Sequence, residues 1–97
     1  MVTFVTLLKW TAQGIKNVKD TVDRAEQARQ GAEKMGGRII NLVWTQGLYD
    51  LVAISEWADE DSYMAWMLSS TASGNLQTET MRAFSAEDVT RFIKKMG

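Results

Sequence analysis

The sequence predicts a single α+β domain over residues 1–97, with the element order β-α-β-β-α-β and one further helix at the end. Three observations support this prediction. Four short runs are rich in β-branched and aromatic residues, segments of helical periodicity lie between them, and the last segment combines a helix cap with an apolar stripe. A content of 45% hydrophobic and 24% charged residues is ordinary for a globular chain and argues against wholesale disorder.

The first strand is expected at residues 3–10, because this run is apolar on both alternating faces and too short for a stable helix. A polar connector containing Gly14 should follow at residues 11–19. The first helix is expected over about residues 20–35, where apolar residues recur at helical spacing, and Gly36 is placed to end it.

The second and third strands are expected at residues 38–45 and 50–57. The four residues between them, 46–49, include Gly47 and form a short turn. Two β-runs around a short loop with a glycine are typical of an antiparallel hairpin.

The second helix should begin near Asp59, a good cap followed by acidic residues, and continue to about Leu68. A loop of small polar residues is expected at 69–74, and the fourth strand at 75–84. Ser85 then caps the final helix, with an acidic residue three positions later as in a capping box. Its apolar stripe consists of Val89, Phe92, Ile93 and Met96. This element order is the split β-α-β pattern of ferredoxin-like folds with a four-stranded antiparallel sheet.

The strands predict that the sheet has a partner. In this fold two helices cover one sheet face, and a bare face in water should be polar at every second position. Large apolar side chains nevertheless occur on both faces of the first three strands. In the first strand Val5 and Leu7 oppose Phe4 and Leu8, and in the third Val52 and Ile54 oppose Leu51 and Ala53. In the second strand Ile39 and Val43 oppose Ile40, Leu42 and Trp44. We therefore expect a homodimer or higher oligomer in which a second sheet covers the bare face. The alternative is a monomer whose terminal helix folds back over its own sheet.

Composition excludes several classes of function. The net charge of −1 provides no basic field for nucleic acid or anionic membranes. The chain has no cysteine and no histidine, so disulfides, thiol nucleophiles and the common zinc and haem ligands are absent, and we expect no metal or cofactor. No run approaches the length of a membrane span and the first residues lack a signal-peptide pattern, so a cytoplasmic protein is expected.

Several short strings, taken in order, resemble the GYD-domain family. They are Val-Thr-Leu-Leu-Lys-Trp at 5–10, Gln-Gly-Ile at 13–15, Glu-Lys-Met-Gly-Gly at 33–37, Trp-Thr at 44–45, Gly-Leu-Tyr-Asp at 47–50 and Thr-Glu-Thr-Met-Arg-Ala-Phe at 78–84. The resemblance runs from about residue 3 to 88 and implies the dimeric α/β-barrel superfamily. Members of the family are largely of unassigned function, so the resemblance implies more about fold than about activity. Wider relatives include cofactor-free monooxygenases and haem-binding enzymes, and the lack of histidine argues against the latter.

The sequence also predicts a candidate ligand site at one end of the sheet. In the ferredoxin-like strand order the first strand lies between the third and fourth and runs antiparallel to both, so its end meets their starts. Polar and aromatic residues should gather there, as in a small-molecule pocket. The candidate ligand-binding residues are Lys9, Trp10, Asn17, Trp44, Tyr49, Asp50 and Glu79.

Each candidate also has a structural interpretation. Lys9 could hold an anionic group and Asp50 could orient it, or the two could form an ion pair between neighbouring strands. Glu79 would become a candidate acid or base if it were buried. The indoles could stack on a planar ligand or simply pack in the core or a dimer interface.

Three hypotheses for function follow. The first is a homo-oligomeric protein that binds a small planar or anionic molecule. The second is a cofactor-free oxygenase-type or isomerase-type enzyme on the same scaffold, which requires a desolvated acid or base in the pocket. The third is an assembly module without ligand, in which the polar groups saturate one another and leave no cavity.

Overall fold

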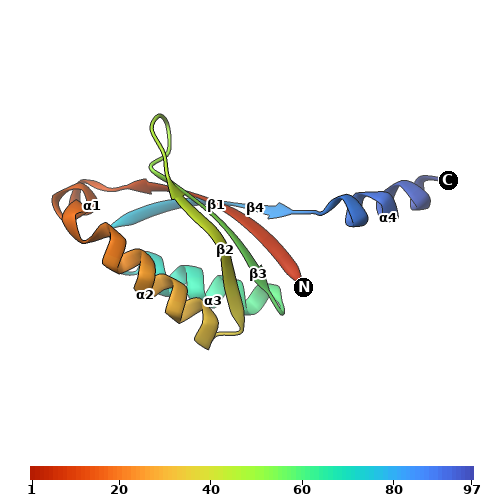
Figure 1. The fold of residues 1–97 in the computed structure, drawn as a ribbon, viewed down its shortest axis with the longest axis horizontal. Coiled ribbons are helices and arrows are strands. Elements are labelled where there is room, and N and C mark those ends of the chain that lie inside the picture. Colours follow the sequence, from red (N-terminus) through yellow and green to blue (C-terminus); the bar gives the residue numbers. More distant parts are fainter.

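The computed structural model describes residues 1–97 and confirms the predicted ferredoxin-like α+β fold (Figure 1). A four-stranded antiparallel sheet has the strand order β2-β3-β1-β4, and α2 and α3 cover one of its faces. In chain order the elements are β1 (Val2–Trp10), α1 (Ala12–Lys16), the 3₁₀ turn η1 (Val18–Asp20), α2 (Thr21–Lys34), β2 (Gly37–Trp44), β3 (Leu51–Trp57), α3 (Glu60–Thr71), β4 (Leu76–Ala83) and α4 (Ala86–Met96).

Two segments differ from the sequence prediction. The connector at 11–19 contains α1 and η1, because the Thr11 side chain caps α1 by accepting a hydrogen bond from the Gly14 amide. Gly14 is required there, since a Cβ would lie 2.1 Å from the carbonyl oxygen of Asn75. Helix α3 continues through the first part of the loop predicted at 69–74, and the hydroxyls of Ser69 and Thr71 find acceptors there in helix carbonyls one turn earlier.

An aromatic cluster forms the main core between the sheet and the helices. Phe4 of β1 stacks on Tyr63 of α3 with ring centroids 4.0 Å apart, and Trp57 of β3 meets the same tyrosine edge-on. The Trp66 indole on α3 donates a 2.9 Å hydrogen bond to the Ala28 carbonyl on α2, which joins the two helices. Gly37 leaves room for the Trp57 ring, which a Cβ at that position would approach to 2.3 Å.

The buried tyrosine is also the centre of a hydroxyl chain. The Tyr63 hydroxyl lies 2.7 Å from the Thr6 hydroxyl on β1 and 2.7 Å from the Thr80 hydroxyl on β4. Thr6 and Tyr63 are fully buried, so this chain satisfies polar groups that water cannot reach.

A β-bulge in β2 changes which of its side chains share a sheet face. The register shifts between Ile39 and Asn41, so that Ile39 and Leu42 both pack on the helix side. Trp44 lies on the helix side too, since its indole hydrogen-bonds Thr21 at the start of α2. The grouping of Ile39 with Val43 expected from strict alternation is therefore wrong, because the extra residue reverses the alternation along the strand.

The other sheet face is open and has an apolar centre. We call it the open face; its side chains alternate with the buried ones on β1 and β3 and lie opposite one another in the strand register. The central side chains are Val5, Leu7, Val43, Val52, Ile54 and Met81. Polar and charged residues surround them. Thr3, Arg38 and Glu56 lie at one end and Lys9 and Gln77 at the other, while Asn41 and Glu79 lie on the two edge strands, opposite Ile54 and Leu7. No element of the same chain covers this face (Figure 1).

Helix α4 leaves the body of the molecule. It continues from the end of β4 and points away from both layers (Figure 1), and none of its residues is buried. The predicted capping box is confirmed, with reciprocal hydrogen bonds between Ser85 and Asp88. The alternative in which this helix folds back over its own sheet is wrong in this structure. None of the helices is long and apolar enough to cross a membrane.

Candidate functional site

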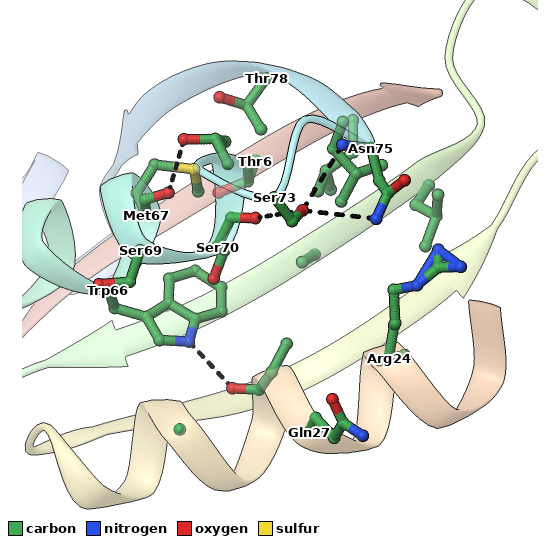
Figure 2. Close-up of a pocket in the computed structure, with 18 of the residues that line it drawn as sticks. Thr6, Arg24, Gln27, Trp66, Met67, Ser69, Ser70, Ser73, Asn75 and Thr78 are labelled. Carbon is green, nitrogen blue, oxygen red and sulfur yellow. Dashed lines mark hydrogen bonds between the residues drawn. The ribbon is translucent and has the colours of Figure 1, made fainter. Parts of the chain in front are cut away.

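A cavity of about 330 Å³ lies between the sheet and the two helices that cover it (Figure 2). Its walls are mostly apolar and come from all four strands and from α2 and α3. The large apolar side chains that line it are Leu8, Trp10, Met35, Leu42, Leu51, Trp66, Met67 and Leu76. On the α2 wall the small residues Ala25, Ala28 and Gly31 lie among Thr21, Arg24 and Gln27. Their three-residue spacing puts them on one helix face, and the Trp66 ring packs against its Gly31 end, 3.8 Å from the position a Cβ would take.

One end of this cavity is polar. Figure 2 shows Arg24 of α2 and Asn75 at this end, with Ser73 close to Asn75. The Asn75 side-chain oxygen accepts hydrogen bonds from Gln13 at 3.1 Å and from Asn17 at 3.3 Å. Asn75 is itself buried, so these bonds fix its orientation.

Arg24 is the only ionisable side chain among the lining residues. Its guanidinium donates to the Asn17 carbonyl and lies 3.6 Å from the Asp20 carboxylate. Because a guanidinium carries five N–H donors in a fixed plane, these two partners leave donors for a further acceptor. The cavity therefore combines apolar walls with a cation and an amide at one end.

Of the residues predicted from sequence, one lines this cavity and two contact its lining residues. Trp10 lines it, Asn17 holds Asn75, and the Trp44 indole donates a 3.1 Å hydrogen bond to Thr21, a lining residue.

Three others lie on the opposite side of the sheet. Lys9, Tyr49 and Glu79 border a smaller hollow of about 210 Å³ on the open face. The Tyr49 hydroxyl donates a hydrogen bond to the Glu79 carboxylate. This bond, with a smaller contribution from desolvation, raises the pKa of Tyr49 above its usual value. The sheet thus divides the predicted cluster into two groups.

Asp50 belongs to neither hollow and has a structural contact instead. Its carboxylate accepts the Trp10 backbone N–H at 2.9 Å, and its own amide donates to the Leu8 carbonyl, which joins the start of β3 to the end of β1. The ion pair suggested between Lys9 and Asp50 is wrong, since neither residue takes part in a salt bridge. Gly47 adopts φ +117°, which explains the glycine in this turn.

The sequence interpretation missed the centre of the cavity. It gave Arg24 no role. The useful signal was the stripe of small residues on α2, because Ala25, Ala28 and Gly31 cannot fill the space in front of a sheet.

No cluster of acidic residues in this structure is suited to a metal ion. Asp59, Glu60 and Asp61 begin α3 as expected, with the Asp59 carboxylate accepting the Ser62 amide. This hydrogen bond lowers the pKa of Asp59.

Comparison with known proteins gives one family and a set of similar folds. The model of the family described as GYD domain matches residues 4–93. Among solved structures, TTHA0845 from Thermus thermophilus is 20% identical with a TM-score of 0.56, covering 89% of this chain and 96% of that one. FFRP-DM1 is 18% identical with a TM-score of 0.55, covering 87% of this chain and 100% of that one. At these identities the likeness extends to the fold alone. No curated protein matches the chain.

Proposed function

Because this chain belongs to the GYD-domain family, and because its fold forms a half-open cavity, we propose that it is a homo-oligomeric small-molecule-binding protein whose ligand occupies the space between the sheet and the helices. The observation that carries the proposal is the cavity itself. Its volume of about 330 Å³ falls at the lower end of the range of small-molecule pockets, about 300–1,000 Å³. A cytoplasmic location is part of the same proposal.

The chemistry of the walls indicates the kind of ligand. Trp10 and Trp66 line the apolar part, which favours a flat or aromatic body. Arg24 and Asn75 lie at the polar end and favour an acceptor, such as a carboxylate or carbonyl, attached to that body.

Binding is favoured over catalysis by the composition of the lining. Cofactor-free oxygenase or isomerase chemistry needs a group that accepts or donates a proton near the ligand. Arg24, the one ionisable lining residue, offers N–H donors and no acceptor. Glu79, the acid or base candidate, borders the open face and lies on the other side of the sheet.

The open face supports the homo-oligomer. An apolar centre with a polar rim is the usual anatomy of a protein interface, and a bare patch of this kind is uncommon in a monomer. A second copy of the same face would bury the central side chains, with two-fold symmetry as the simplest arrangement.

The probe for the binding test is anilinonaphthalene sulfonate, which has a flat apolar body and an anionic group. We expect its fluorescence to increase with the native protein, and Ala25→Phe to remove most of that increase because the new ring fills the cavity. Val22→Phe is the matched control, since Val22 lies one turn earlier on α2, is exposed and does not line the cavity.

Equal dye binding by both variants would show that the dye sits elsewhere, for example on the open face, and would contradict the cavity as the ligand site. Urea unfolding of both variants at one protein concentration shows whether each is folded. A native protein that binds no dye and no metabolite from its own cell extract would favour the assembly module instead.

A further inference from the structure

Helix α4 presents an apolar stripe that its own chain does not cover. Val89 and Phe92 remain 43% and 41% exposed, Ile93 58% and Met96 83%. The capping box shows that the helix is well formed at its start, with basic residues in its last turn. Such a strongly amphipathic helix is expected to bury its apolar side against another surface.

Local contacts hold α4 away from its own sheet. Only Phe84 and Ser85 connect it to β4, and the capping box fixes Ser85. The Phe84 ring meets Phe92 edge-on at 5.1 Å, and the Arg82 guanidinium lies 4.8 Å from the Phe84 ring centre. Folding α4 back over the open face would require a reversal within these two residues and the loss of these contacts.

The exposed apolar area of α4 and Phe84 is large enough to form a stable dimer interface. Phe84 is 51% exposed, and with about 200 Å² for a large apolar side chain, Phe84 and the four stripe residues together expose about 550 Å². Two such helices related by two-fold symmetry would remove about 1,100 Å² of their own surface from water, and the surfaces that they cover would lose a similar area, so the total reaches about 2,000 Å², the size of a stable interface. The second copy that covers the open face in the proposed homo-oligomer also brings further surface within reach of α4, which continues from the end of β4.

We propose that α4 is an exchange arm: in the homo-oligomer, the apolar stripe of each α4 packs on a second copy of this chain and not on its own. The inference rests on the proposed homo-oligomer and specifies which segment holds the copies together. Both arms make the same contact in a two-fold dimer, so each copy gives one arm and receives one.

The first test is analytical ultracentrifugation of Ile93→Glu against Thr90→Glu. Both changes add one negative charge at an exposed position of α4, but only Ile93 belongs to the apolar stripe. We expect Ile93→Glu to raise the dimer dissociation constant at least about tenfold, which corresponds to about 1.4 kcal/mol, and Thr90→Glu to change it less than about twofold.

The outcomes separate the two proposals. If the native protein is a dimer and Ile93→Glu leaves the dissociation constant unchanged, the exchange arm is wrong and the homo-oligomer stands. If the native protein is a monomer at micromolar concentration, both are wrong.

The second test shows directly where the arm lies. The natural chain has no cysteine, so a spin label on Met96→Cys marks the end of α4 alone. The labelled chain is mixed with isotope-labelled natural chain, which cannot take the spin label. Broadening of resonances in the isotope-labelled natural chain supports the proposal, because the spin label then lies against a second copy. In the reverse mixture the spin-labelled chain carries the isotope. Broadening seen only in that mixture would place α4 on its own chain and overturn the proposal.

Discussion

Replacing the buried tyrosine tests whether the hydroxyl chain stabilises the fold. In Tyr63→Phe the ring keeps its stacking on Phe4, but the hydroxyl between Thr6 and Thr80 is lost. A hydrogen bond contributes about 1 kcal/mol net, and a buried hydroxyl left without a partner costs about 1–3 kcal/mol. Thr6 is buried, whereas Thr80 is exposed and can turn to water. We therefore expect Tyr63→Phe to lower the free energy of unfolding by about 2 kcal/mol, or Tm by about 10 °C for a domain of this size.

A double-mutant cycle identifies the cause. Thr6→Val alone should cost about 1 kcal/mol, because Tyr63 retains Thr80 as a partner. The double variant should cost about 2 kcal/mol, less than the sum of the single variants, because the valine no longer leaves a hydroxyl unpaired. Urea unfolding at one fixed protein concentration measures all three, since association also changes apparent stability. Strict additivity, or a Tyr63→Phe effect below about 0.5 kcal/mol, would refute the reasoning.

Three further predictions test other contacts. Gly37→Ala should lower the free energy of unfolding by about 1–3 kcal/mol in chemical denaturation, because its Cβ would lie 2.3 Å from an indole carbon. Gly31→Ala is the control: its Cβ would lie 3.8 Å from the nearest ring atom, so this change should be neutral or stabilising by up to about 1 kcal/mol. The pKa of Asp59 is lowered in the folded protein, so its contribution to stability is complete above its unfolded pKa of about 3.9 and is lost as pH falls through its folded pKa. Between about pH 5 and 3, unfolding curves of Asp59→Asn should therefore show a smaller loss of stability than those of the natural chain. Equal losses would contradict this. The raised pKa of Tyr49 favours the neutral phenol, so its contribution to stability is complete below the unfolded pKa of about 10 and is lost as pH rises through the folded pKa. Glu79→Gln removes the carboxylate that accepts the phenol hydrogen bond, so it should lower the pKa of Tyr49 in an NMR titration of the ring. An unchanged midpoint would show that the hydrogen bond does not raise this pKa.

The sequence predicted the fold because its signals were local. The runs of β-branched residues, the hairpin glycine and the Ser85 capping box each depend on neighbouring residues, and all are confirmed. Helix α1 was missed because its cap is a threonine in a short polar segment, and its position depends on contact with Asn75. The bulge after Ile39 was missed because an extra residue in a strand leaves no mark in an apolar run.

The candidate site was predicted only in part, because sequence placed residues at an end of the sheet without assigning them to a face. Trp10 and Lys9 are neighbours in the chain, yet one lines the cavity and the other the hollow on the open face. The cavity was not predicted because it depends on the small side-chain volume on one face of α2 and on the distance between the two helices and the sheet.

The alternation along β1 has a consequence for how this protein can change. Even-numbered positions such as Thr6 and Leu8 face the cavity, while odd-numbered ones such as Val5 and Leu7 face outward. A substitution at one position therefore alters the cavity without touching the outer surface, and its neighbour does the reverse. The proposed ligand site and the proposed oligomer contact can accordingly vary independently within one strand, and either surface can be redesigned with the other held constant.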